Sequence, residues 1–133
     1  MPKNFRAAAL AIALPFAAQA APRQDPMTLT GHDHTVKECM EASEFILHAA
    51  QARDNKQSGT KFMQRLEDDL TLVRKLPPHL RWFVYSKTHE EFLRAWVKEV
   101  FATQRSPQEL QRDALVRCQG GRAPNPMDSL NPF

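Results

Sequence analysis

The sequence predicts an all-α fold: four main helices in an antiparallel up-down bundle, a short helical turn between the second and the third, and one disulfide, Cys39–Cys118. Three observations support this prediction. A Ser or Thr followed three residues later by Glu, which is typical of a helix start, occurs at three places. Apolar residues recur at three- and four-residue steps after each start. The chain has only two cysteines, and they lie at the two ends of this pattern.

The first predicted helix begins after Thr35, where Thr35 and Glu38 form a capping-box pattern. We expect it to continue until the stretch RDNKQSG, where Gly59 can end it. A second helix is predicted from about Lys61 until Pro77 and Pro78 stop it. The apolar positions that support these two helices are Val36, Cys39, Met40, Ile46, Leu47, Ala49, Ala50, Phe62, Leu66, Leu70 and Val73.

The stretch PPHLRWFVYS between the second and third helices is the densest aromatic segment of the chain. Pro78 can begin a single helical turn. Four consecutive large side chains, 82–85, are also compatible with a short strand. We favour the helical turn because no partner strand is visible elsewhere, but residues 79–85 leave both alternatives open.

The third helix is predicted to start at the Thr88 and Glu91 pair, and the fourth at Ser106 and Glu109, with Pro107 at the first helical position. The fourth should end at Gly120–Gly121. The supporting apolar stripes are Phe92, Leu93, Trp96, Val97, Val100 and Phe101 in the third helix and Leu110, Ala114 and Cys118 in the fourth.

The ends of the chain predict an exported protein. Residues 1–20 combine Lys3 and Arg6 with an apolar stretch and a closing Ala-Gln-Ala, which is typical of a signal peptide cleaved after Ala20. We expect a flexible lead over 21–33, a helical domain over 34–121 and a disordered tail over 122–133. No second apolar stretch of membrane-spanning length follows, so we expect a periplasmic protein without a membrane anchor after cleavage.

An oxidising compartment and two cysteines favour a disulfide. An even number of antiparallel helices places the start of the first and the end of the last at the same end of a bundle, so Cys39 and Cys118 can meet.

Charge argues against nucleic-acid binding. The chain has 18 Lys and Arg against 15 Asp and Glu, and removal of residues 1–20 takes away Lys3 and Arg6 alone, which leaves a net charge of +1.

His32, Asp33 and His34 carry ligand types that a transition metal prefers. A specific site needs three or four ligands held by ordered structure, so we interpret these residues as polar neighbours of the Thr35 cap and predict no cofactor.

Glu41, Glu44 and His48 share one helix face at i, i+3 and i+7. No nucleophile motif or glycine-rich phosphate loop accompanies them, so we predict that the chain is not an enzyme.

Aromatic residues give the remaining functional prediction. Trp, Tyr and Arg are the residue types that anchor protein interfaces. Trp96 lies on the stripe of the third helix and belongs to the core, whereas Arg81, Trp82 and Tyr85 lie on a short linker that cannot bury all of them. We therefore expect a non-catalytic protein that binds another periplasmic protein, with these three residues as anchors.

Over residues 39–118, the segments CMEASEFILHAAQARDNKQS, LPPHLRWFV and FLRAWVKEVFATQRSPQELQRDALVRC resemble small exported two-cysteine helical proteins of proteobacteria with no assigned function. The resemblance implies a periplasmic helical domain and no catalysis. In architecture, the expected fold is also similar to helical, disulfide-bonded immunity proteins that block toxins delivered into the periplasm, and to small acid-stress chaperones of that compartment. Inhibition of such a toxin, a chaperone role, and metal binding or hydrolysis are the alternative functions.

Overall fold

A computed structural model of the chain describes residues 25–30 and 34–120. In these residues the chain forms four α-helices and one 3₁₀ turn, without a β-strand. This confirms the predicted all-α class and the number of main helices. The elements are α1 (Val36–Asp54), α2 (Gly59–Val73), η1 (Pro78–Leu80), α3 (Lys87–Ala102) and α4 (Pro107–Cys118).

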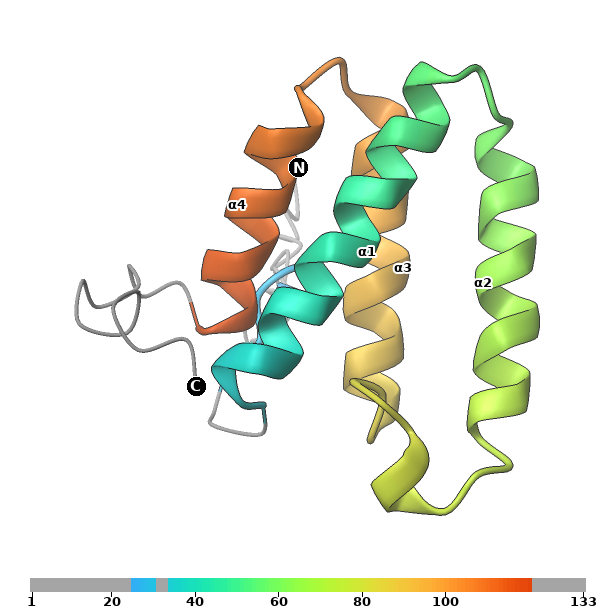
Figure 1. Cartoon of the computed structure of the whole chain (residues 1–133), viewed down its shortest axis with the longest axis vertical. Helices are drawn as coiled ribbons and strands as arrows, with labels where there is room; N and C mark the ends of the chain where they lie inside the picture. The colour runs from blue at the N-terminus through green and yellow to red at the C-terminus, as the bar shows by residue number, and fades with distance from the viewer. Residues whose placement is uncertain (1–24, 31–33, 121–133) are drawn as a thin grey trace, which may run out of the picture.

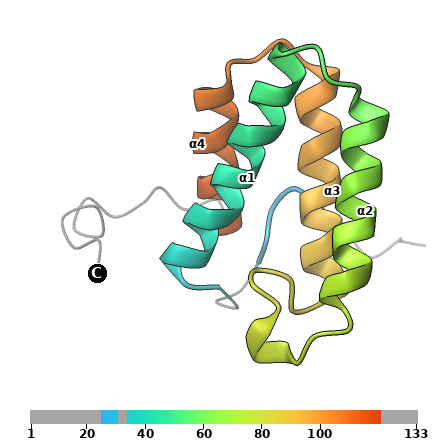
Figure 2. The ribbon, with the colours of Figure 1, turned by 45° about the vertical axis from the view of Figure 1, so that its right-hand side comes forward.

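Successive helices run antiparallel, as predicted (Figure 1). The helix α1 is central: it packs against α4 on one side and α3 on the other. The helix α2 lies on the outer side of α3, which is its main neighbour (Figure 2). The bundle therefore has α1, α3 and α4 around its core, with α2 added at the edge. Trp96, Phe92, Ile46 and Leu110 are fully buried in that core.

Two of the three predicted helix starts are confirmed by their hydrogen bonds. The Thr35 hydroxyl accepts a bond from the backbone N–H of Glu38 at 3.1 Å. The Ser106 hydroxyl accepts one from the N–H of Glu109 at 3.2 Å, with Pro107 at the first helical position. Because these pairs satisfy free N–H groups within the local chain, sequence spacing was enough to find them.

Two predicted boundaries are wrong. Gly59 begins α2 instead of ending the first helix, because Ser58 takes the N-cap position and its hydroxyl accepts a bond from Lys61 N. The first helix has already ended at Asp54. Thr88 is not a cap either, since α3 begins at Lys87. The carbonyl of Ser86 already accepts bonds from the N–H groups of His89 and Glu90, so the helix starts before Thr88.

The linker between α2 and α3 contains no strand. It forms the single turn η1 and then a tight turn in which Val84 N donates to Arg81 O at 3.0 Å. Trp82 has a φ of 52°, in the left-handed region that large side chains rarely adopt. The short helical turn preferred from the sequence is thus confirmed, and the alternative strand is not formed.

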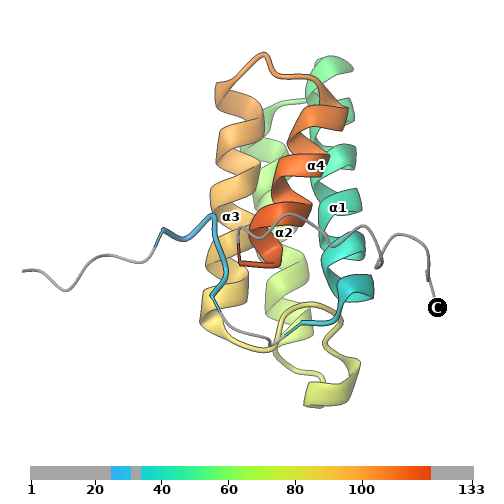
Figure 3. The same ribbon diagram turned by 90° about the vertical axis from the view of Figure 1, so that its left-hand side faces the viewer.

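Residues 25–30, which lie within the predicted flexible lead over 21–33, pack against the bundle, and the rest of that range lies outside the described residues. Leu29 is buried, and its N–H donates to Arg117 O in α4 at 3.0 Å. The indole Nε1 of Trp96 in α3 donates to Met27 O at 3.0 Å. The segment therefore connects α3 with α4 (Figure 3). These contacts follow no repeating spacing along the chain, so no sequence pattern predicts them.

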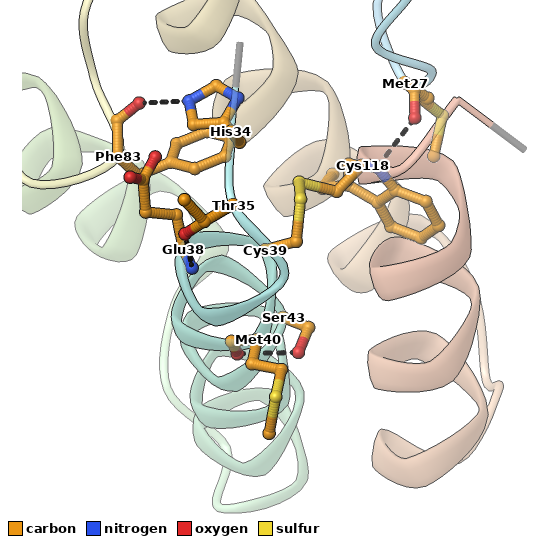
Figure 4. Close-up of a disulfide and its surroundings, with 10 residues drawn as sticks. Met27, His34, Thr35, Glu38, Cys39, Met40, Ser43, Phe83 and Cys118 are labelled. Carbon is orange, nitrogen blue, oxygen red and sulfur yellow. Dashed lines mark hydrogen bonds between the residues drawn. A yellow bond between two sulfur atoms is a disulfide. The ribbon is translucent and has the colours of Figure 1, made fainter. Parts of the chain in front are cut away.

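The predicted disulfide is present. Cys39 and Cys118 are bonded, with their Cα atoms 5.7 Å apart, and both residues are buried. Figure 4 shows that the bond joins the first turn of α1 to the last turn of α4. The even number of antiparallel helices thus brings the two cysteines together, as expected.

At the opposite end of α1, Arg53 holds three chain segments together. Its guanidinium donates to the carbonyls of Val100 at 3.0 Å, Thr103 at 3.1 Å and Arg105 at 2.7 Å. These carbonyls belong to the end of α3 and to the loop that leads into α4. A cation at a helix C-terminus satisfies free carbonyls and interacts favourably with the helix dipole.

Replacement of both cysteines, Cys39→Ala with Cys118→Ala, should lower the free energy of unfolding by about 4.5 kcal/mol in the chain-entropy model. The reason is that the bond joins residues separated by 79 positions and so restricts nearly the whole unfolded domain. Urea denaturation followed by circular dichroism measures the change. A loss below about 1 kcal/mol would show that the bond adds little to the fold.

Arg53→Ala should lower the free energy of unfolding by about 3 kcal/mol, because three partly buried carbonyls lose hydrogen bonds to a charged donor. Arg112→Ala is the matched control, since Arg112 is exposed on α4. It should change stability by no more than about 0.5 kcal/mol. Equal effects of the two variants in thermal and urea unfolding would contradict the anchoring role of Arg53.

Candidate functional site

The linker residues 81–85 meet the first two turns of α1 at one end of the bundle. Two large side chains remain partly exposed there: Trp82 at 39% and Tyr85 at 40%. The residues between them, Phe83 and Val84, are buried. We call the surface formed by Trp82, Tyr85 and two carboxylates of α1, Glu38 and Glu41, the Trp82–Tyr85 patch.

Phe83 determines how the linker is placed. Its ring packs against Phe92 of α3, with 5.6 Å between the ring centroids. Because Phe83 is directed into the core and the backbone at Trp82 is left-handed, the neighbouring indole is placed outside. The tertiary packing of one aromatic residue thus exposes the next one.

Arg81, predicted as an interface anchor, makes internal contacts. Its guanidinium donates to Leu76 O at 2.7 Å and to Arg74 O at 2.9 Å. These bonds satisfy carbonyls at the end of α2 and hold the linker in its turn. Arg81 therefore positions the patch, and we do not count it as part of the contact surface.

Trp82 is fixed by a polar contact and an apolar contact to α1. Its Nε1–H donates to Glu41 Oε2 at 2.9 Å. Its ring makes an edge contact with Phe45, at 6.3 Å between centroids. The indole is consequently held in one orientation although a large part of its surface remains open.

Tyr85 is held by His34 and Glu38. Its ring stacks against the His34 ring at 5.6 Å. Partial burial raises the pKa of the Tyr85 phenol, and the nearby Glu38 carboxylate raises it further. The phenol is therefore a neutral hydrogen-bond donor at physiological pH.

His34 belongs to this end of the bundle and supports the linker. Its Nε2 lies 2.7 Å from Phe83 O, and its ring stacks on Phe83 at 4.1 Å (Figure 4). Because a carbonyl oxygen only accepts, Nε2 carries the proton and donates in this contact. His32 and Asp33, the other two residues of the predicted metal set, lie outside the described residues.

Glu38, Glu41 and Glu44 form no ion pair with the residues that the structure describes. Glu38 Oε2 is buried and has no hydrogen-bond partner within this part of the chain. In the described ranges no three His, Cys, Asp or Glu side chains are grouped to hold a metal ion. Glu41, Glu44 and His48 therefore do not converge on a shared metal, although they occupy neighbouring turns of α1.

A second polar group connects α2 to α3. Arg74 binds the Glu90 carboxylate, and Arg94 Nη2 donates to Glu90 at 3.1 Å and to Glu67 at 3.0 Å. Glu90 is buried, and α2 itself buries only Leu66 and Leu70. These ion pairs add to the apolar contacts of α2, in which Phe62, Met63 and Val73 pack against the core. Only the i,i+4 spacing of Glu90 and Arg94 was visible in the sequence.

Two open grooves lie between helices. One of about 530 Å³ lies between α2 and α3, and one of about 300 Å³ lies between α1 and α4. The first is lined by Gly59, Thr60, Met63, Gln64, Glu67, Val97, Lys98, Phe101 and Ala102, and the second by Met40, Ser43, Glu44, Gln108, Gln111, Arg112 and Leu115. In the second groove the Ser43 hydroxyl donates to Met40 O at 2.7 Å, within α1.

Comparison of the chain with protein-family models, curated proteins and solved structures found no match. None of the described helices has the length and apolar character required to cross a membrane. The inference of function therefore depends on the geometry of the patch and on the sequence pattern of the chain ends.

The carboxylates make stability depend on pH. Hydrogen bonds from Arg94 lower the pKa of Glu67, and those from Arg74 lower the pKa of Glu90, below the ordinary value of 4.5. A carboxyl group whose pKa is lower in the folded chain than in the unfolded chain stabilises the fold at pH values above its unfolded pKa. This stabilisation is lost as the pH falls from about 4.5 through the pKa of the folded state. The free energy of unfolding should therefore decrease in this acidic range.

Glu90→Gln should lower the free energy of unfolding by about 2 kcal/mol at pH 7, because it removes a charged acceptor. It should also make the free energy of unfolding fall less steeply with decreasing pH. Glu44→Gln is the control and should change neither quantity, since Glu44 is exposed and outside the network. Urea denaturation between pH 3 and pH 7 tests both statements. Parallel pH profiles for wild type and Glu90→Gln would show that Glu90 is not responsible.

Proposed function

We propose that this chain is a non-catalytic protein of the periplasm that binds another protein through the Trp82–Tyr85 patch. The observation that supports this function is the partial exposure of two fixed aromatic side chains on a linker whose intervening residues are buried. Tryptophan and tyrosine are the residue types that contribute most to protein interfaces.

The fixed geometry of the patch favours binding. The contacts of Trp82 with Glu41 and Phe45, and of Tyr85 with His34, restrict both rings before any partner arrives. Binding then costs less side-chain entropy than it would with mobile rings. The left-handed backbone at Trp82 agrees with this interpretation, because backbone strain is concentrated at functional segments.

Export is part of the proposal and has two supports. Residues 1–20 have the charge and apolar pattern of a signal peptide. The buried Cys39–Cys118 bond suits an oxidising compartment.

Capture from periplasmic extract tests the function. The mature chain should retain a specific partner, and Trp82→Ala should reduce retention at least tenfold, because central aromatic anchors contribute about 2 kcal/mol or more. Leu72→Ala is the matched control, since Leu72 is a large exposed apolar residue on α2. It should retain the partner like wild type.

The thermal transition of each variant must stay close to that of the wild type for this comparison. Capture of nothing by any form, or equal capture by wild type and Trp82→Ala, would contradict the proposal.

A further inference from the structure

We propose that the Trp82–Tyr85 patch recognises a cationic side chain of the partner protein, preferentially an arginine. This inference rests on the proposed function, because it takes the patch as the interaction surface. It adds the chemistry of the group that the patch accepts.

The first argument is uncompensated negative charge. Glu41 is bonded to the neutral indole N–H of Trp82, and Glu38 lies against the neutral phenol of Tyr85. Neutral donors satisfy hydrogen bonds but leave the charge of each carboxylate in place. Glu67 and Glu90, by contrast, are paired with arginines. A cation from a partner would supply the charge that the described residues do not provide at Glu38 and Glu41.

The second argument is the state of Glu38. Its Oε2 is buried and has no hydrogen-bond partner within the described residues. Buried acceptors of this kind normally find a donor. An N–H group of a partner that reached this oxygen would supply the missing donor.

The third argument is the pair of exposed aromatic rings. Cations are attracted to the faces of tryptophan and tyrosine, and the attraction is strongest for tryptophan. Trp82 and Tyr85 keep 39% and 40% of their surfaces open beside the two carboxylates. A guanidinium fits this combination better than an ammonium, because it is planar, stacks on rings and binds carboxylates through two N–H groups.

The same features disfavour other partners. An acidic segment would be repelled by Glu38 and Glu41. A purely apolar segment would cover the two carboxylates without a counter-charge, which is unfavourable. The patch is therefore best matched by a basic, arginine-containing segment.

The experiment titrates the ¹⁵N-labelled mature chain with a blocked Gly-Arg-Gly peptide and follows the indole N–H signals by NMR. The chain has two tryptophans, and buried Trp96 serves as the internal reference for exposed Trp82. The Trp82 signal should shift and saturate, and the same peptide with citrulline should bind at least tenfold more weakly. Equal binding of the two peptides, or no shift at Trp82, would overturn the proposal.

A double variant, Glu38→Gln with Glu41→Gln, tests the carboxylates and should weaken arginine-peptide binding at least tenfold. The matched control, Asp68→Asn with Asp69→Asn, removes two charges from exposed residues of α2 and should change binding less than twofold. Equal weakening by both double variants would indicate general charge attraction and overturn the proposal.

Failure of this inference can be distinguished from failure of the proposed function. If a partner is captured through Trp82 while its capture is unchanged by Glu38→Gln with Glu41→Gln, the proposed recognition of a cation is wrong. In that case the proposal that the Trp82–Tyr85 patch binds a protein still stands.

Discussion

The covalent bond between Cys39 and Cys118 is the constraint on which the rest of the structure depends. It joins the start of the central helix α1 to the end of α4 and so fixes one end of the bundle. His34 and the Thr35 cap lie within five residues of Cys39, and Arg117, which receives the Leu29 bond, is next to Cys118. The patch is built on the same first turns of α1. The bond thus restricts the unfolded chain at the same end of α1 that carries the two carboxylates of the patch.

The other helices are held by different forces. Arg53 fixes the opposite end of α1 to the end of α3 through backbone carbonyls. The edge helix α2 packs Leu66 and Leu70 into the core, and the ion pairs of Glu67 with Arg94 and of Arg74 with Glu90 connect it to α3. The contribution of a partly buried ion pair to the free energy of unfolding changes with pH. The contribution of apolar burial does not depend on pH. The attachment of α2 is therefore sensitive to acid, and so is the contact of residues 25–30 with α4, where Asp25 is paired with Arg117 and has a lowered pKa.

The candidate surface was only partly predictable. Trp82 and Tyr85 could be selected because a short linker cannot bury every member of an aromatic run. Arg81 was selected with them by residue type, but its guanidinium caps the end of α2. Glu38 and Glu41 were assigned to a helix cap and to a possible acid cluster. Their association with Tyr85 and Trp82 depends on a linker more than 40 positions away in the chain, and no spacing rule covers such a distance.

By itself, the sequence determined the helical class, the order of the helices, two of the caps and the pairing of the cysteines. Each of these depends on neighbours within a few residues, or on the parity of the helix count, and such relations are present in the sequence. Tertiary structure alone decided the packing of residues 25–30, the edge position of α2 and the exposure of Trp82. These features depend on which groups meet across the bundle, because burial of Phe83 and Leu29 requires cavities that exist only after α1, α3 and α4 have packed.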